Sequence, residues 1–159
     1  MKALQLILCL SIFTILSCSS DDDNGPDTSP VTEPFFTKIN GQDFTAITIN
    51  AALVSENTIA IEGINAENTD IILGFSGNLT PGTEFKTIFN SDGTNIFTPI
   101  YDSDEGGFFA TSGTLTIVSH NETTREISGR FSFAGADPND SNSSLNFTEG
   151  EFSVTYTSL

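Results

Sequence analysis

The chain contains two cysteines and one histidine among its 159 residues. Cys9 lies inside an apolar N-terminal run and Cys18 follows it, so the rest of the chain offers no thiol for a disulfide or zinc site. Because His120 is the single imidazole and no mature thiol remains, Cys–His catalysis is excluded, and any metal site must be rich in oxygen ligands. The folded part must therefore gain its stability from packing.

Basic residues are also scarce, with 5 Lys and Arg against 21 Asp and Glu and a formal net charge of −16. Nucleic acid is disfavoured as a partner, because phosphate contacts are made by Lys and Arg. An acidic surface also repels anionic lipid headgroups. With no Trp and two Tyr, the chain is poor in the amphipathic aromatic side chains that stack on sugars.

The N-terminus begins with a positive residue, Lys2, followed by an apolar run from Ala3 to Leu16. Only Gln5, Ser11 and Thr14 interrupt it. A helix needs about 20 apolar residues to cross the hydrocarbon core, and this run is shorter. The pattern predicts a signal peptide over residues 1–17.

The end of this run, Leu16-Ser17-Cys18, resembles a bacterial lipobox. The resemblance implies that Cys18 is the first mature residue, with a diacylglycerol on its sulfur and an acyl chain, such as palmitate, on its amine. Two or more acyl chains anchor a protein stably, since each buried methylene contributes about 0.8 kcal/mol. The alternative is a cysteine that falls near an ordinary cleavage site.

The next residues, Ser19, Ser20, Asp21, Asp22 and Asp23, resemble the export tract of surface lipoproteins of the Bacteroidota. That resemblance implies a lipid-anchored protein of the outer membrane that faces the cell exterior. The alternatives are a periplasmic-facing lipoprotein and a plain solvated acidic linker. Residues 18–33, with Pro26 and Pro30, are predicted to form a flexible tether.

Residues 34–159 are predicted to form one domain of ordinary size. Short Ile, Val, Phe and Thr runs alternate with Gly, Asn, Asp and Ser, and no stretch has an apolar period of 3.6. We therefore predict an all-β fold, an antiparallel β-sandwich or partly closed β-barrel of about eight to ten strands. The predicted strands are Phe35–Ile39, Asp43–Ala46, Ile47–Val54, Thr58–Ile64, Asp70–Phe75, Thr83–Ile88, Ile96–Tyr101, Phe108–Ser119, Glu126–Phe133 and a last strand from Leu145.

Local signals refine this prediction. Asn40-Gly41 predicts a tight hairpin, because both residues tolerate positive φ. Pro99 cannot donate to a sheet ladder, so its strand is predicted to lie at an edge. The apolar residues before and after Glu149-Gly150 have opposite parity, which predicts a β-bulge there.

The clearest predicted hairpin pairs the segments on either side of a turn near residues 121–124. Leu115 and Ile117 are expected to face Ile127, Phe131 and Phe133. Most phenylalanines fall at alternating strand positions, which indicates core packing.

Strand and turn motifs together resemble an uncharacterised family of Bacteroidota lipoproteins, of flavobacterial type, with one small all-β domain. The resemblance rests on the lipobox, Ile39-Asn40-Gly41-Gln42-Asp43-Phe44, Gly113-Thr114-Leu115-Thr116-Ile117, Ile127-Ser128-Gly129-Arg130-Phe131-Ser132-Phe133 and Gly150-Glu151-Phe152. It implies a fold and an anchor, but no activity and no functional residues.

Catalytic motifs are not found. His120 is expected at a hairpin turn as an ordinary exposed histidine, and Gly74-Phe75-Ser76-Gly77 lacks the Gly-x-Ser-x-Gly spacing. Carboxylate pairs cannot be nominated when so many acidic residues are present. We expect the protein not to be an enzyme and to need no cofactor, calcium being the one candidate ion.

Two acidic segments gather oxygen ligands that suit calcium. They contain Asp102, Asp104 and Glu105, and Asp137, Asn139 and Asp140. Neither keeps the EF-hand pattern, and the alternative is a solvated turn, since these side chains bond nearby backbone.

The leading functional hypothesis is a lipid-anchored, non-catalytic module that binds or supports an unknown protein or glycan partner. One alternative is a lipocalin-like barrel that holds a small apolar ligand in a cavity lined by phenylalanine. The other is a hydrolase that uses two facing carboxylates.

Overall fold

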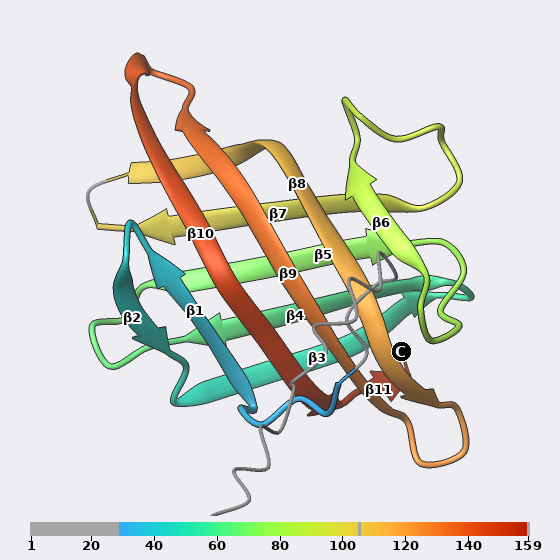
Figure 1. Ribbon diagram of the computed structural model, residues 1–159. Coiled ribbons are helices and arrows are strands. Elements are labelled where there is room, and N and C mark those ends of the chain that lie inside the picture. The colour runs from blue at the N-terminus through green and yellow to red at the C-terminus, as the bar shows by residue number, and fades with distance from the viewer. Residues whose placement is uncertain (1–28, 105, 159) are drawn as a thin grey trace, which may run out of the picture.

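The computed structural model describes residues 29–104 and 106–158, which form one sheet of eleven strands (Figure 1). The strands are β1 (Phe35–Ile39), β2 (Gln42–Thr45), β3 (Thr48–Ser55), β4 (Thr58–Ile64), β5 (Asp70–Ser76), β6 (Glu84–Thr87), β7 (Ile96–Ser103), β8 (Gly106–Asn121), β9 (Glu126–Asp137), β10 (Asp140–Thr155) and β11 (Thr157–Ser158). The predicted all-β class is confirmed. The structure has one strand more than the eight to ten that were predicted. The additional strand is β11, which is too short to show an alternating pattern.

The signal peptide, Cys18 and the acidic tract Ser19–Asp23 lie outside the described residues. Across the described ranges, no helix has the length and apolarity needed to cross a membrane.

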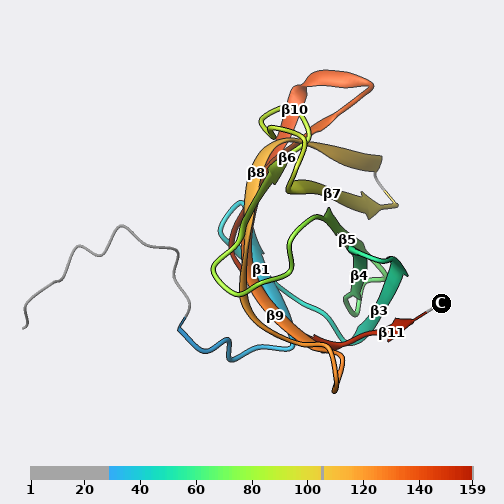
Figure 2. The ribbon, with the colours of Figure 1, turned by 90° about the vertical axis from the view of Figure 1, so that its right-hand side faces the viewer.

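The strand order is β11-β3-β4-β5-β7-β6-β8-β9-β10-β1-β2, and β7 also pairs with β8. Neighbours are antiparallel except for β6 with β7 and β11 with β3. Figure 2 shows the sheet curled into a half-barrel, with β3, β4, β5 and β7 facing β1, β8, β9 and β10. This is the partly closed barrel of the prediction.

Apolar side chains fill the space between these two walls. The burial pattern of β4 and of β5 alternates at every residue, as expected of strands with one face in a core. Phe133 and Phe147 stack with their ring centroids 3.9 Å apart and an interplanar angle of 7°. Each fully buried side chain of this size contributes about 1.5 to 3 kcal/mol. The predicted packing of the phenylalanines is thus observed in the core.

The predicted hairpins form. Asn40 and Gly41 have φ values of 49° and 83°, and β1 pairs with β2 directly across them. In the β8–β9 hairpin Leu115 lies opposite Phe131, and both are buried.

The prediction that Pro99 marks an edge strand is wrong. On one side β7 pairs with β5 from Ile96 to Asp102, with Pro99 opposite Leu73. On the other side the partner changes: β6 pairs with Ile96 and Phe97, whereas β8 pairs from Ile100 onward. Pro99 falls in the gap between these two partners, so the proline is accommodated inside the sheet.

The segment before β1 runs along the outside of the sheet. The Arg130 guanidinium on β9 donates to the carbonyl oxygens of Ser29 at 2.8 Å and Pro30 at 3.3 Å. Thr32 donates to the Glu151 carboxylate at 3.1 Å. The last residues of the predicted tether therefore contact the domain.

The predicted bulge at Glu149-Gly150 is confirmed, because the β9–β10 register shifts between Phe147 and Gly150. Glu149 takes the positive φ, 53°. Gly150 is needed for space, since a Cβ atom there would lie 2.6 Å from the ring and the carbonyl oxygen of Phe131.

We expect Gly150→Ala to lower the free energy of unfolding by about 2 to 3 kcal/mol, because the added methyl overpacks against Phe131. Urea titration of the purified protein measures this. Gly107→Ala is the matched control, since the nearest atom to a Cβ there is 3.6 Å away. Its free energy of unfolding should change by less than about 0.5 kcal/mol. Equal effects of the two substitutions would contradict the packing explanation.

Candidate functional site

An open groove of about 1060 Å³ lies at one end of the half-barrel, and we call it the end groove. Its walls come from segments far apart in the sequence, whose turns gather on the right of Figure 1. It is lined by Leu53, Glu56, Asn57, Gly77, Asn78, Leu79, Thr80, Pro81, Thr94, Asn95, His120, Glu122, Arg125, Tyr156 and Ser158. Most of these side chains are polar, so the groove suits a ligand that forms hydrogen bonds.

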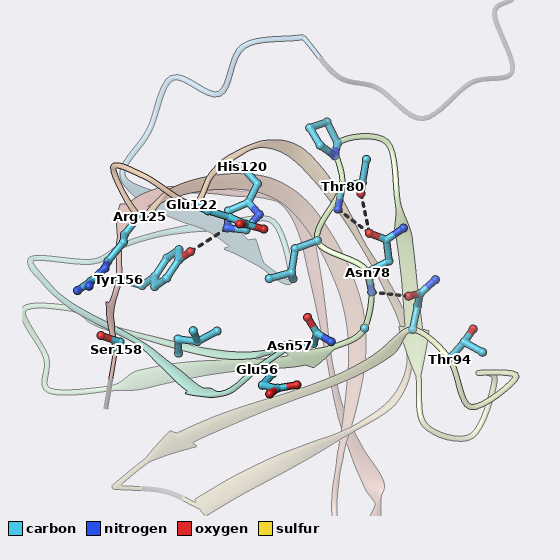
Figure 3. Close-up of a pocket in the computed structure, with 15 residues that line it drawn as sticks. Glu56, Asn57, Asn78, Thr80, Thr94, His120, Glu122, Arg125, Tyr156 and Ser158 are labelled. Atoms are coloured by element: carbon cyan, nitrogen blue, oxygen red, sulfur yellow. Dashed lines mark hydrogen bonds between the residues drawn. The ribbon is translucent and has the colours of Figure 1, made fainter.

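His120 and Tyr156 meet in this groove (Figure 3). The His120 Nε2 atom and the Tyr156 hydroxyl are 2.9 Å apart, in hydrogen-bonding distance. His120 lies within β8, opposite Ile127, and is half-buried. The prediction of an exposed histidine in a turn is therefore wrong, because β8 continues to Asn121 and Tyr156 covers the imidazole.

Tyr156 is held from both ends. Its hydroxyl meets His120, and its backbone N–H donates to the Arg125 carbonyl at 2.9 Å. Burial raises the pKa of the Tyr156 hydroxyl, and the Glu122 carboxylate raises it further, while Arg125 lowers it. The phenol is thus neutral at physiological pH, which suits a structural hydrogen bond rather than a nucleophile.

The β5–β6 loop forms one wall and is fixed by its own hydrogen bonds. The Asn95 carboxamide oxygen accepts from the Asn78 N–H at 3.0 Å, and the Asn78 oxygen accepts from the Thr80 N–H at 3.0 Å. Gly77, with φ 152°, donates to the Asn57 carbonyl at 3.0 Å. This wall is therefore shaped before any ligand binds.

The β8–β9 turn forms the opposite wall. The Asn121 carboxamide oxygen accepts from the Thr123 N–H at 3.0 Å and the Thr124 N–H at 3.1 Å. The turn presents Glu122 and Arg125 to solvent at the groove rim. Figure 3 places Glu56, from the β3–β4 turn, across the groove from Glu122.

The two predicted calcium segments lie near each other, on the side of Figure 1 opposite the end groove. Asp102 belongs to β7 and pairs with Gly107. A Cβ atom on Gly106 would lie 3.9 Å from the Asp137 carboxylate. Both segments are tight turns between strands rather than open loops.

These acidic side chains mainly bond their own backbone. Asp102 accepts from the Ser103 N–H at 3.1 Å, and Asp137 accepts from the Asn139 N–H at 2.7 Å. Asp140 likewise accepts from the Asn142 N–H at 3.0 Å.

Outside the masked positions, no three Asp, Glu, His or Cys side chains are arranged to hold a metal ion. Asp104 lies in the β7–β8 turn, and Glu105 lies outside the described residues. The calcium hypothesis remains a prediction without geometric support.

Asp70 borders this acidic corner, opposite Asp102 in the β5–β7 ladder. Its Oδ1 atom is buried and has no hydrogen-bond partner in the structure. Burial raises the pKa of the Asp70 carboxyl, and the neighbouring carboxylates of Asp102 and Glu62 raise it further. The ionised carboxylate therefore costs stability at neutral pH.

We expect Asp70→Asn to raise the Tm at pH 7, because it removes a negative charge that faces Asp102 and has a buried oxygen without a partner. Because the folded pKa lies above the unfolded one, wild-type stability is lost as pH rises through the folded pKa. The advantage of the variant should vanish below the unfolded pKa of Asp. Calorimetry at pH 3 and pH 7 measures both values.

Asp92→Asn is the comparison, because the pKa of Asp92 is shifted in the direction opposite to that of Asp70. Hydrogen bonds from the Thr94 hydroxyl and N–H lower the pKa of Asp92, so its carboxylate adds stability above the unfolded pKa. This substitution should bring no gain at pH 7. A gain equal to that of Asp70→Asn would contradict the assignment.

Comparison with known proteins identifies the family. Residues 32–154 match the family described as Domain of unknown function (DUF6252), a range that runs from before β1 almost to the end of β10. No curated protein and no solved structure matches the chain. The matched range contains every groove segment except Tyr156 and Ser158. The chain belongs to the DUF6252 family.

Proposed function

We propose that the protein is a lipid-anchored lipoprotein of the outer membrane, of the Bacteroidota type, displayed on the cell surface. Its domain is a non-catalytic module that binds a polar ligand in the end groove. The anchor rests on the signal run after Lys2, on Cys18 at its end and on the acidic tract that follows. The acidic domain itself has little affinity for anionic lipid, so the acyl chains hold the membrane.

The end groove is the observation that carries the binding role. Its walls are turns and loops fixed by hydrogen bonds of their own, as between Asn78 and Asn95. A site that needs no rearrangement loses little conformational entropy when a ligand binds. The polar side chains on these walls offer both hydrogen-bond donors and acceptors.

Binding is favoured over hydrolysis. Glu56 and Glu122 are the carboxylates of the groove, and both are exposed. A glycosidase needs one carboxyl kept protonated by apolar surroundings, which these exposed positions do not supply. His120 could act as a general base, but its Nε2 atom meets the Tyr156 hydroxyl, which is not suited to act as a nucleophile.

An apolar ligand in the interior is less well supported. The inside of the half-barrel holds buried phenylalanines in contact with one another, including Phe75 with Phe85 and Phe97 with Phe133. An apolar guest would have to displace these side chains from a packed core. The end groove offers space without that cost.

Native mass spectrometry of the full lipoprotein, isolated from its outer membrane, tests anchor and binding together. We expect an acyl mass that fragmentation places on Cys18, and a second, non-covalent mass. Cys18→Ala should lose the first mass and move the protein to the soluble fraction. Asn57→Trp should lose the second, because the indole fills the groove at an exposed turn position.

Gln42→Trp is the control for the groove variant, since Gln42 is exposed on β2 and outside the groove. It should keep both masses. An unmodified Cys18 in the membrane fraction would contradict the anchor. A non-covalent mass retained equally by both tryptophan variants would contradict the groove.

A further inference from the structure

We infer that the ligand of the end groove is an uncharged carbohydrate chain, an inference that rests on the proposed binding function. The charged rim provides the first reason. The groove is lined by two carboxylates, Glu56 and Glu122, and one guanidinium, that of Arg125, so it has no excess of positive charge. Phosphate, nucleic acid and acidic polysaccharides need such an excess.

The mixture of polar groups provides the second reason. Carboxylates accept hydrogen bonds only, a guanidinium donates only, and carboxamides such as that of Asn57 do both. A sugar hydroxyl donates and accepts at once. A sugar ring that carries several hydroxyls can therefore form hydrogen bonds with polar groups on both walls of the groove. Two neighbouring hydroxyls can donate to the same carboxylate. Figure 3 shows such opposed groups, with Glu122 and Arg125 across the groove from Glu56 and Asn57.

The apolar part of the lining provides the third reason. Leu53 and Leu79 line the groove while packing against the hydrophobic core, so they form a fixed apolar surface beneath the polar rim. Sugars present C–H groups on a ring face and hydroxyls around its edge. A ligand with an apolar face and a polar edge matches this arrangement better than a lipid, which would leave the rim unpaired.

The groove lacks a broad aromatic platform. The chain has no Trp, and Tyr156 is 5% exposed, so its ring is covered. Recognition must therefore rest on hydrogen bonds and on contacts with Leu53 and Leu79. Each of these contacts is individually weak. Display of many anchored copies on one surface compensates through multivalency.

Binding of the full lipoprotein in detergent to an array of neutral linear and branched glycans tests the inference. Hexagalacturonate serves as the anionic comparison. We expect binding to at least one neutral glycan and none to hexagalacturonate. Glu122→Ala and Asn57→Ala should each weaken it tenfold or more, since each removes a groove hydrogen-bonding group. Glu67→Ala and Asn139→Ala are matched controls in exposed turns outside the groove, and should bind normally.

The outcomes separate this inference from the function on which it rests. A peptide or lipid retained in native mass spectrometry, with no glycan bound on the array, would overturn the inference that the ligand is a carbohydrate. It would leave the proposed binding role of the groove intact. Glycan binding that survives Glu122→Ala and Asn57→Ala would overturn both the carbohydrate inference and the binding role of the groove. Cleavage of a bound glycan, lost in Glu122→Ala, would keep the carbohydrate and overturn the non-catalytic role.

Discussion

The structure depends on packing of aromatic side chains between the two walls of one curled sheet. Without a disulfide in the domain, the sheet is held closed by contacts between the walls, such as that of Phe97 on β7 with Phe133 on β9, whose ring centroids are 6.3 Å apart. Phe147, on the neighbouring strand β10, stacks on Phe133 with its centroid 3.9 Å away. The interior is thus occupied, and the end groove lies where the strands end.

The end groove follows from the same packing. Because the walls are fixed, the turns that leave them have fixed starting points, and their own hydrogen bonds complete their shape. Tyr156 illustrates the connection, since it is buried against the core and also bonded to His120 and Arg125 at the groove. One residue thereby joins the last strand to the β8–β9 turn. A preformed site of this kind suits binding better than a chemical step that needs a buried acid.

Local features of the fold were predictable from the sequence because their causes are local. Asn40-Gly41 determines a turn, and the change of parity around Glu149-Gly150 requires a bulge. Pro99 was misplaced because its tolerance depends on where β6 ends and β8 begins, which no neighbouring residue indicates. The groove was not predictable for the same reason: His120 and Tyr156 are far apart in sequence and meet only through the curl of the sheet. Both residues were visible as rare types, but nothing in the sequence paired them.

If ligands bind this protein at the end groove, a photoreactive side chain placed there should capture them. Site-specific photo-crosslinking in living cells measures this, with a benzophenone side chain in place of Asn57 in the groove or of Gln42 on β2. We expect a crosslinked ligand from position 57 and none from position 42. Crosslinks from position 42 alone, equal crosslinking from both positions, or none from position 57 would contradict it.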